Sequence, residues 1–461
     1  MGTPRGDGPD GRTGAVTLHI NNQRDLSPQL ADVDPQTNMA DITLLDQAGY
    51  PVRRVPVPIK PLAAYLRRLT VGQLDIGLPN ETTLSVKGPR PGPKADMQVH
   101  RWRMLPRAVI RGDVGLGEAF MAGDWDSPDV SQLLQFFAAN TLTNGEQFKA
   151  RGVAGWFLAA LQRVRTNSLR RAPKNIAAHY DLGNAFYGAW LDPSMTYSAG
   201  LYLDETDDLE RAQYNKNNAL IEALAIGPDD HVLEIGCGWG GFACQAAKHT
   251  GCRVTAITLS PAQRDFVEQR IKAEGLSDRV SVREMDYRSV EGQFDKIVSI
   301  EMIEAVGERF WPIYFERVAH LLRPGGLFGL QAITIRDDAF AEYRKTSDFL
   351  QTYIFPGGML LPEAGLRTLA RQAGLEPAPP MVFGDDYAKT LVAWKSRFEA
   401  AWPEIAPMGF DERFQRMWMY YFATCEAGFR SGLITVSQTV FRPHPPKQAQ
   451  RQSNARQSRD G

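Results

Sequence analysis

A glycine-rich segment in the middle of the chain has the residue types and spacing of a ligand-binding loop. It reads VLEIGCGWGGFA, residues 232–243, and follows an apolar, β-branched run. Its glycines are Gly236, Gly238, Gly240 and Gly241. Glycine lets a backbone turn tightly and approach a ligand closely, because it has no Cβ. Glu234 adds a carboxylate just before the loop, so we expect the ligand to carry a cationic group.

Two kinds of nucleotide ligand use such a loop, and the acids around it distinguish them. A dinucleotide site usually has an acid about 20 residues after the loop, on the ribose hydroxyls. The corresponding run here ends in Thr258-Leu259-Ser260, without an acid. An acid before the loop suits the amino-acid end of S-adenosylmethionine better than a pyrophosphate. We therefore predict an S-adenosylmethionine site; a dinucleotide site and a loop that serves packing only are the alternatives.

Strand-like runs that alternate with helical stretches indicate how these residues are positioned. The runs are residues 231–235, 253–259, 280–282, 296–300 and 327–331. Such alternation predicts an α/β fold with a doubly wound, mostly parallel sheet, Rossmann-like as in class I methyltransferases, over residues 175–442. Asp286 follows the third run, where its carboxylate could accept the adenine amino group; a solvated loop residue is the alternative.

Residues 39–146 have a different pattern, which predicts a smaller N-terminal α+β domain. Runs at residues 40–45, 83–86 and 108–110 read as strands between turn signals. Pro128 and Asp129 can open a helix that follows them. The polar segments 1–38 and 443–461 are expected to be disordered.

Residues 147–174 form a basic amphipathic stretch between these two regions. Its apolar residues are Trp156, Phe157, Leu158, Leu161 and Val164, and its basic residues are Lys149, Arg151, Arg163, Arg165, Arg170, Arg171 and Lys174. One interpretation is a helix that lies on an anionic membrane surface. The other is a linker helix with a solvated basic face.

The overall composition excludes several classes of protein. The 461 residues include 52 basic and 53 acidic side chains, so no net field favours nucleic acid. Four cysteines without a CxxC pair and seven scattered histidines show no metal-ligand spacing, so we predict no metal site. No apolar run reaches the length of about 18 residues needed to span a bilayer. We expect a cytoplasmic protein.

Several longer motifs resemble one enzyme family. They are NIAAHYDLGNAFYGAWLDPSMTYSAGLY (175–202), VLEIGCGWGG, ITLSPAQ (257–263), VSIEMIEAVG (298–307), YIFPGGMLL (353–361), FEAAWPEI (398–405) and YYFATCEAGFR (420–430). Together they resemble the cyclopropane-fatty-acyl-phospholipid synthases and the mycolic acid cyclopropane synthases. The motifs keep their order over more than half of the chain. The region before residue 145 resembles the N-terminal lipid-binding domain of the phospholipid enzymes much less specifically.

The resemblance implies a reaction and a set of site residues. In this family the methyl group of S-adenosylmethionine goes to an alkene carbon of a fatty-acyl chain, and loss of a proton from the new methyl closes a cyclopropane. Aromatic faces can stabilise the intermediate carbocation. The aromatic residues in matching motifs are Tyr180, Tyr197, Phe355, Tyr387, Tyr420 and Tyr421. By family position, the cofactor should contact Tyr180, Tyr197, Ser198, Gly236, Gly238, Thr258 and Gln263.

The sequence departs from the family where a bicarbonate ion usually acts as the base. A Cys, a Glu, a His and a Tyr hold that ion in the family. Glu304 and Tyr421 match, but the Cys position is Ala199 and the His position is Gln331. Glutamine can still donate a hydrogen bond to an anion, whereas an alanine side chain cannot. We take Glu304, Tyr421 and Gln331 as the candidate catalytic residues.

These departures leave two products open. The expected reaction is cyclopropane formation on unsaturated phospholipid at the inner face of the membrane, reached from the water side. If the base is displaced, the cation can instead lose a proton from the chain, which gives a methyl-branched or methylene chain. A small-molecule methyltransferase and a non-catalytic lipid-binding protein are the alternatives from other classes. Homodimer formation is left open.

Overall fold

The computed structural model describes residues 39–52, 63, 66–144 and 182–444 of the chain. The expectations for residues 1–38, for the basic stretch 147–174, for Tyr180 and for residues 445–461 therefore lie outside the described part. Pro443 belongs to a strand rather than to a disordered tail. Within the described ranges, no helix is both long and apolar enough to cross a membrane.

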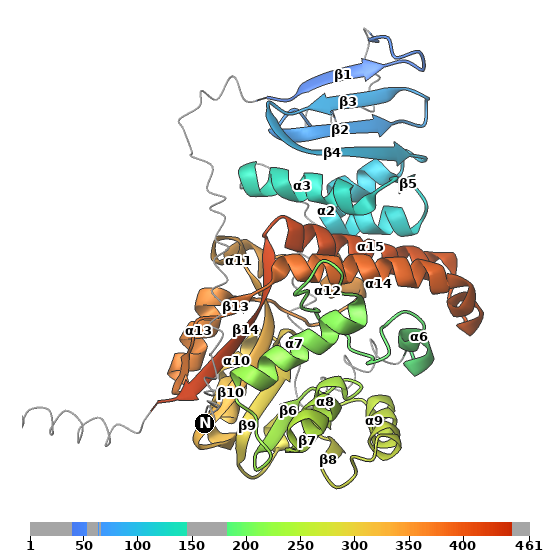
Figure 1. Ribbon diagram of the computed structural model, residues 1–461. Helices are drawn as coiled ribbons and strands as arrows, with labels where there is room; N and C mark the ends of the chain where they lie inside the picture. The colour runs from blue at the N-terminus through green and yellow to red at the C-terminus, as the bar shows by residue number, and fades with distance from the viewer. Residues whose placement is uncertain (1–38, 53–62, 64–65, 145–181, 445–461) are drawn as a thin grey trace, which may run out of the picture. The chain divides into compact units, whose positions relative to one another are not determined.

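Among the described residues, the N-terminal region contains a five-stranded sheet packed with the helices α2 (Met104–Met121) and α3 (Val130–Asn144). The sheet order is β1-β3-β2-β4-β5, with β2 and β4 parallel and the other pairs antiparallel. The strands are β1 (Asp41–Leu45), β2 (Val71–Gly77), β3 (Thr83–Lys87), β4 (Arg90–Val99) and β5 (Trp125–Asp126). Figure 1 shows α2 and α3 beside this sheet. Asp129 caps α3 by accepting a hydrogen bond from the amide of Gln132, as its sequence predicts.

The strand predicted at residues 108–110 is wrong, because these residues lie in α2. Pro106 stands in the first turn of this helix, where proline is tolerated. Val109 and Ile110 are β-branched but mostly exposed, so no packed sheet surface supports an extended conformation there. A kink at Gly112, with φ of 59°, separates this first part of α2 from the rest.

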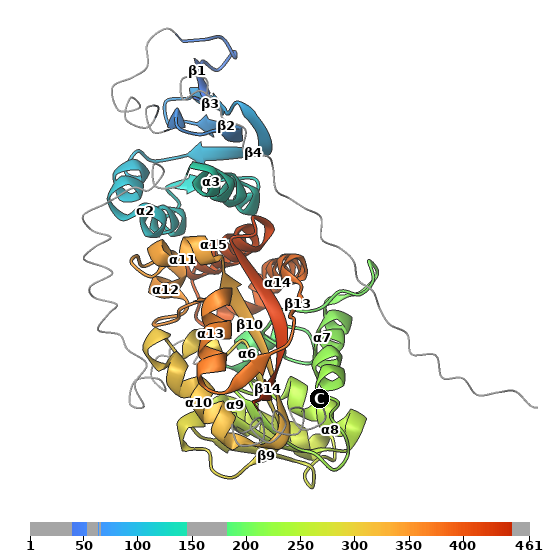
Figure 2. The same ribbon diagram turned by 90° about the vertical axis from the view of Figure 1, so that its left-hand side faces the viewer.

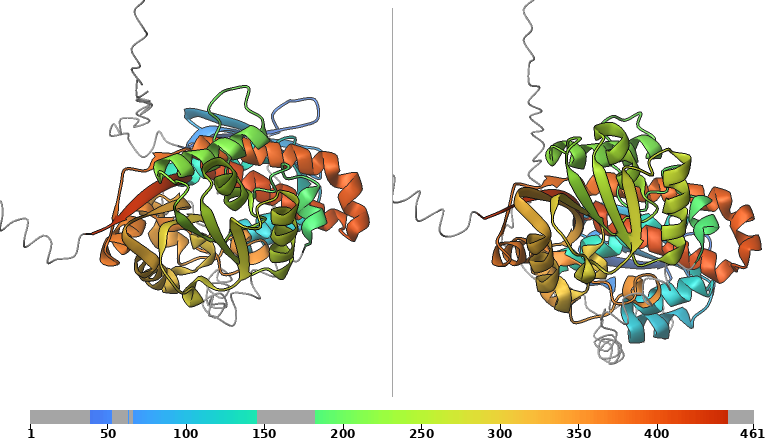
Figure 3. Two further views of the ribbon diagram at one scale, coloured as in Figure 1. Left: turned by 60° about the horizontal axis from the view of Figure 1, so that its bottom comes forward. Right: turned by 90° about the horizontal axis from the view of Figure 1, so that it is seen from below.

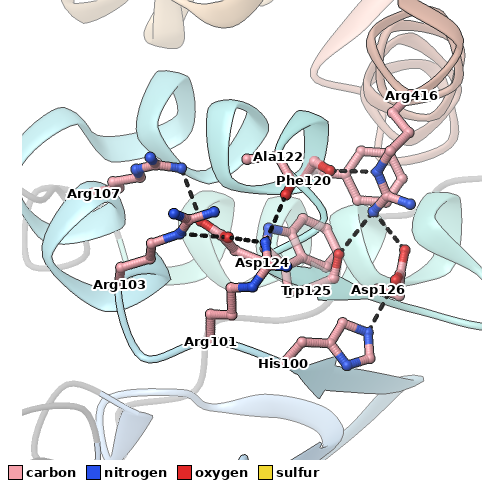
Figure 4. Close-up of polar contacts among 10 residues, drawn as sticks. All are labelled: His100, Arg101, Arg103, Arg107, Phe120, Ala122, Asp124, Trp125, Asp126 and Arg416. Carbon is pink, nitrogen blue, oxygen red and sulfur yellow. Dashed lines mark hydrogen bonds and ion pairs between the residues drawn. The ribbon is translucent and has the colours of Figure 1, made fainter. Parts of the chain in front are cut away.

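The N-terminal region is joined to the C-terminal helix α15 (Glu412–Arg430) by a group of charged contacts (Figure 4). Arg416 of α15 donates to the carbonyl oxygens of Phe120 and Trp125 and forms an ion pair with Asp126 at 2.6 Å. Its guanidinium also lies 4.1 Å from the centre of the Phe120 ring. Beside this contact, the unexposed carboxylate of Asp124 is paired with three arginines: Arg101, Arg103 and Arg107.

The larger sheet has the order β12-β14-β10-β9-β6-β7-β8. Its parallel strands are β6 (His231–Ile235), β7 (Arg253–Thr258), β8 (Val280–Glu284), β9 (Phe294–Ile300) and β10 (Leu322–Ile335). The antiparallel strands at one side are β12 (Leu375–Pro377), β13 (Met381–Val382) and β14 (Ile434–Pro443), and the short β11 (Leu361–Pro362) runs parallel to β10. All five predicted strands are present, and the predicted α/β fold is confirmed.

Helices cover both faces of this sheet (Figure 3). Val232 packs with α7 (Leu209–Ala223), α8 (Gly241–Thr250) and α9 (Pro261–Ala273). Its neighbour Leu233 packs with α10 (Trp311–Leu321) and α13 (Glu363–Gln372) on the other face, because successive strand side chains alternate. The strand order reverses between β6 and β9, and in open α/β sheets ligands bind beyond the carboxyl ends of the strands at such a point.

The remaining helices surround this carboxyl edge. They are α6 (Asn184–Gly188), α11 (Asp337–Tyr343), α12 (Phe349–Tyr353) and α14 (Gly384–Ile405). α15 contacts α14 as well as α2 and α3 (Figure 2). Aromatic side chains from α6, α14 and α15 fill the space between them, with Phe186, Trp394 and Phe398 fully buried.

Candidate active site

A cavity opens at the carboxyl ends of β6, β7 and β9, where the strand order reverses. It has about 970 Å³ of empty space, its open mouth included. The predicted cofactor residues that line it are Tyr197, Ser198, Glu234, Gly236, Gly238, Thr258 and Gln263. The structure thus brings together residues from three separate motifs, and the size of the cavity suits a ligand such as S-adenosylmethionine.

The glycine loop has the backbone conformation that its sequence predicts. Gly236, Gly238 and Gly240 all have positive φ, at 82°, 52° and 79°. A Cβ on Gly236 would lie 2.7 Å from Cγ of Met302, whereas a Cβ on Gly238 would meet no atom within 4 Å and would stand in the cavity. Gly240 does not line the cavity; it forms the N-cap of α8.

Glu234 is the lining residue that fits a cationic ligand. Its side chain is buried, and its Oε2 has no hydrogen-bond partner among the described residues. Burial raises the pKa of this carboxyl to about 8, although the nearby charge of Lys216 opposes the shift. An ammonium group from a ligand would satisfy the free oxygen and stabilise the ionised form. The residues present therefore fit the amino-acid end of S-adenosylmethionine.

Lys216 is a cavity residue that sequence reasoning missed. It lies on α7, is fully buried, and donates a hydrogen bond to Oγ of Ser198 at 2.8 Å. Burial lowers the pKa of its ammonium to about 8, and the negative charge of Glu301 works against this decrease. A lysine on an amphipathic helix usually reads as part of the solvated face, so the sequence contains no signal for this position.

In the structure, Arg288 binds the Asp286 carboxylate that was predicted to contact adenine. Both carboxylate oxygens of Asp286 accept hydrogen bonds from Arg288, at 2.8 and 2.7 Å. Its neighbours Met285 and Tyr287 line the cavity, but Asp286 does not. On the neighbouring strand, Thr258 donates to Oε1 of Gln263 at 2.7 Å. This pair fixes two predicted cofactor residues in place.

A second polar cluster stands at the inner end of the cavity, around Glu301. Oε1 of Glu301 accepts hydrogen bonds from the backbone amide of Ala199 at 2.9 Å and from Nε2 of Gln331 at 2.7 Å. Its Oε2 accepts one from the hydroxyl of Tyr387 at 2.6 Å. Glu301 lines the cavity, and sequence reasoning missed it. The sequence did contain a signal for this position. Glu301 directly follows the strand-like run 296–300, just as Asp286, which was predicted as a site residue, follows the third run.

None of the three predicted catalytic residues, Glu304, Tyr421 and Gln331, lines the cavity itself. Glu304 lies in a short 3₁₀ helix, Ile303–Ala305, and its Oε1 accepts a hydrogen bond from the amide of Ile333 at 2.5 Å. Burial and the charge of Glu301 raise the pKa of Glu304 to about 8. Tyr421 shares a hydrogen bond of 2.7 Å between its hydroxyl and that of Tyr197, which lines the cavity.

The aromatic ring of Tyr197 lines the cavity beside these groups. It lies 5.1 to 5.6 Å, centre to centre, from the buried rings of Tyr187, Trp190 and Trp394. The π face of Tyr197 could stabilise a carbocation in the cavity. Tyr420, by contrast, packs against Phe120 and other rings between α2 and α15, so it belongs to the core.

Comparison with known proteins identifies the family of this arrangement. The sequence profile of the mycolic acid cyclopropane synthetase family matches residues 167–439. The tuberculostearic acid methyltransferase of Mycobacterium tuberculosis is 38% identical over 362 residues, 76% of this chain and 83% of its own. The cyclopropane-fatty-acyl-phospholipid synthase of Escherichia coli is 36% identical over 366 residues, 78% of this chain and 90% of its own.

A solved structure agrees with these sequence matches. The crystal structure of a mycolic acid cyclopropane synthase complexed with SAH and CTAB covers 58% of this chain and 97% of its own, with 28% identity and a TM-score of 0.55. The part of the chain that matches includes the glycine loop and the Glu301 cluster. The chain therefore belongs to the mycolic acid cyclopropane synthetase family and is an S-adenosylmethionine-dependent methyltransferase of the kind that modifies lipids.

Proposed function

We propose that this enzyme methylates a double bond of an unsaturated fatty-acyl chain in membrane phospholipid and releases a methyl-branched or methylene chain without closing a ring. The choice of product rests on one observation. The two positions where the resemblance expects a Cys and a His on the bicarbonate ion, 199 and 331, both donate to Oε1 of Glu301 instead. The hydrogen-bond donors at these two positions are therefore not available to a bicarbonate ion, which acts as the base for ring closure in the family.

The chain's own residues support this reaction in three ways. When bound, S-adenosylmethionine supplies an electrophilic methyl group. Glu234 and Gly238 bind and orient the cofactor at the glycine loop. The ring of Tyr197, which lines the cavity, stabilises positive charge on the acyl chain beside the new methyl group, and the buried rings behind it keep water away. An alkene is a weak nucleophile, so holding it in place against the methyl group accounts for much of the catalysis.

Two relatives support the choice of lipid as substrate, and they differ on the product. The relative from Mycobacterium tuberculosis is named as a methyltransferase of a fatty acid, and the one from Escherichia coli as a cyclopropane synthase acting on phospholipid. The exposed Val109 and Ile110 on α2 suit contact with a lipid surface.

The product can be identified with a labelled methyl donor. The full chain is incubated with vesicles of monounsaturated phosphatidylglycerol and S-adenosylmethionine that carries a trideuterated methyl group. The fatty acids are then examined by mass spectrometry and proton NMR. A methyl-branched chain keeps all three deuterons and shows an olefinic proton. A methylene chain keeps two deuterons as =CD2, so its double bond is detected by carbon-13 NMR, or as olefinic protons in a parallel reaction with unlabelled donor. Products with cyclopropane protons and no double bond would refute the proposed outcome.

A further inference from the structure

The carboxylate of Glu301 has the surroundings of a functional group rather than of a structural one. Its three hydrogen-bond donors come from different parts of the chain: the loop before α7 with Ala199, strand β10 with Gln331, and helix α14 with Tyr387. The side chain is partly exposed, and the space that it faces is the cofactor cavity. A fixed anion at that place can reach a bound substrate.

The backbone of Glu301 is in a conformation that costs energy. Its φ is 48°, in the left-handed region that residues other than glycine rarely adopt. Glycine has no Cβ and would adopt this φ without strain. Strain of this kind persists mainly at functional sites, where the surrounding structure holds the residue in place. The strained position thus places the carboxylate at the end of β9, between the cofactor loop and β10.

Two glutamates share this region, and their partners decide which one carries the charge. Glu301 accepts three hydrogen bonds and is attracted by the buried ammonium of Lys216. Glu304 accepts one from a backbone amide, and its Oε2 has no partner among the described residues. These contacts favour the negative charge on Glu301 and the proton on Glu304. Burial raises the pKa of Glu301, so its carboxylate is more basic than one in water.

We propose that Glu301 is the general base of this enzyme and that its carboxylate replaces the dissociable bicarbonate ion. In this step a C–H bond of the methylated acyl cation breaks. The bonding electrons form the π bond of a carbon–carbon double bond to the cationic carbon, which neutralises the cation, and the proton moves to the Glu301 carboxylate. Water that enters the cavity after product release removes the proton. No oxidant or reductant is needed.

The same contacts explain why a separate anion is not required. The donors at positions 199 and 331 already bind Oε1 of Glu301. A second anion among them would lie beside a like charge in a largely enclosed space, which is unfavourable. The inference rests on the proposed function only in taking an acyl double bond as the substrate.

The test compares two substitutions of Glu301 in buffer freed of carbon dioxide. Glu301→Gly removes the carboxylate, relieves the positive φ and leaves the donors of Ala199, Gln331 and Tyr387 around an open space. Glu301→Gln keeps the size but removes the basicity. Methyl transfer to monounsaturated phosphatidylglycerol vesicles is measured with and without added bicarbonate or formate. Calorimetry of S-adenosylhomocysteine binding confirms that each variant is folded.

Wild-type turnover should not respond to bicarbonate. Both variants should lose activity by about 100-fold or more, the usual effect of removing a general base. Saturable recovery by the small anions should occur with Glu301→Gly alone, because the glutamine side chain still fills the space. A merely structural role would not produce this rescue.

Two results would overturn the assignment. One is a wild-type enzyme that requires bicarbonate; the other is a folded, cofactor-binding Glu301→Gly that stays fully active or that no anion restores. The structure of the wild-type product is a separate readout. A cyclopropane product would refute the proposed function, while the rescue experiment would still decide on Glu301.

Discussion

Glu234 gives a prediction in which pH reports directly on the cofactor site. Its buried carboxyl has a pKa of about 8, so in the free enzyme it is mostly protonated below this pH and mostly ionised above it. The ammonium of the cofactor is attracted only by the ionised form. Affinity for S-adenosylhomocysteine, which carries the same amino-acid group, should therefore rise as the pH rises through 8.

The expected magnitude follows from this titration. With a pKa of about 8, roughly a tenth of the Glu234 carboxyls are ionised at about pH 7 and roughly nine tenths at about pH 9. The dissociation constant should fall by up to about tenfold over this interval, less the part lost as the ligand's own amino group gives up its proton towards the upper end. A hydrogen bond to a charged group contributes about 1.5–3 kcal/mol, so Glu234→Gln should weaken binding by about 10- to 150-fold at the upper end of the range.

Isothermal titration calorimetry of wild type, Glu234→Gln and Asp229→Asn over this pH range tests the prediction. Asp229 is an exposed acid on the same segment and controls for the change in net charge. Lys216 and Arg270 also face Glu234, and any pH dependence that they cause remains in the glutamine variant. A wild-type affinity that is flat or decreasing with pH, or a glutamine variant that keeps the same slope, would refute this account of the site.

Three further outcomes follow from other parts of the structure. Gly238→Val should place a side chain in the cavity and abolish detectable cofactor binding in calorimetry while the circular dichroism spectrum is retained; unchanged affinity would remove the loop from the site. Ala199→Cys with Gln331→His should convert the product to cyclopropane only when combined with Glu301→Gly, because Glu301 otherwise fills the anion position; NMR of the fatty acids measures this, and a ring produced by the double variant alone would contradict it. Asp124→Asn should lower the free energy of unfolding by about 1–3 kcal/mol in urea titrations, since three half-exposed arginines lose their shared carboxylate. The exposed Asp96→Asn is its control, and an equal effect there would show that the cluster has no special role.

The sequence by itself determined those features that depend on neighbouring residues. Gly236, Gly238 and Gly240 need positive φ for a tight turn, and a strand followed by a helix sets where that turn lies. Alternating β-branched runs predicted all five parallel strands, because side-chain periodicity is a local property. Asp129 as a helix cap and Glu234 as an acid beside the cofactor loop are likewise readable from a few residues around them.

Only the tertiary structure decided which groups meet at the catalytic end of the cavity. Positions 199, 301, 331 and 387 lie far apart in the chain and converge because β9 and β10 are adjacent in the sheet and α14 packs nearby. The resemblance placed Ala199 and Gln331 as losses from an anion site, yet it gave no indication that Glu301 takes up their hydrogen bonds. Nor did the sequence indicate that both carboxylate oxygens of Asp286 accept hydrogen bonds from Arg288.

The error at residues 108–110 has the same physical origin. β-Branched residues favour a strand only where a sheet surface receives them, and here Val109 and Ile110 are mostly exposed on a helix. The burial of Lys216 was unreadable for a related reason, because a charged side chain becomes a core residue only when partners such as Ser198 and Glu301 surround it. The helix at residues 108–110 and the burial of Lys216 both depend on packing between segments that are distant in the sequence.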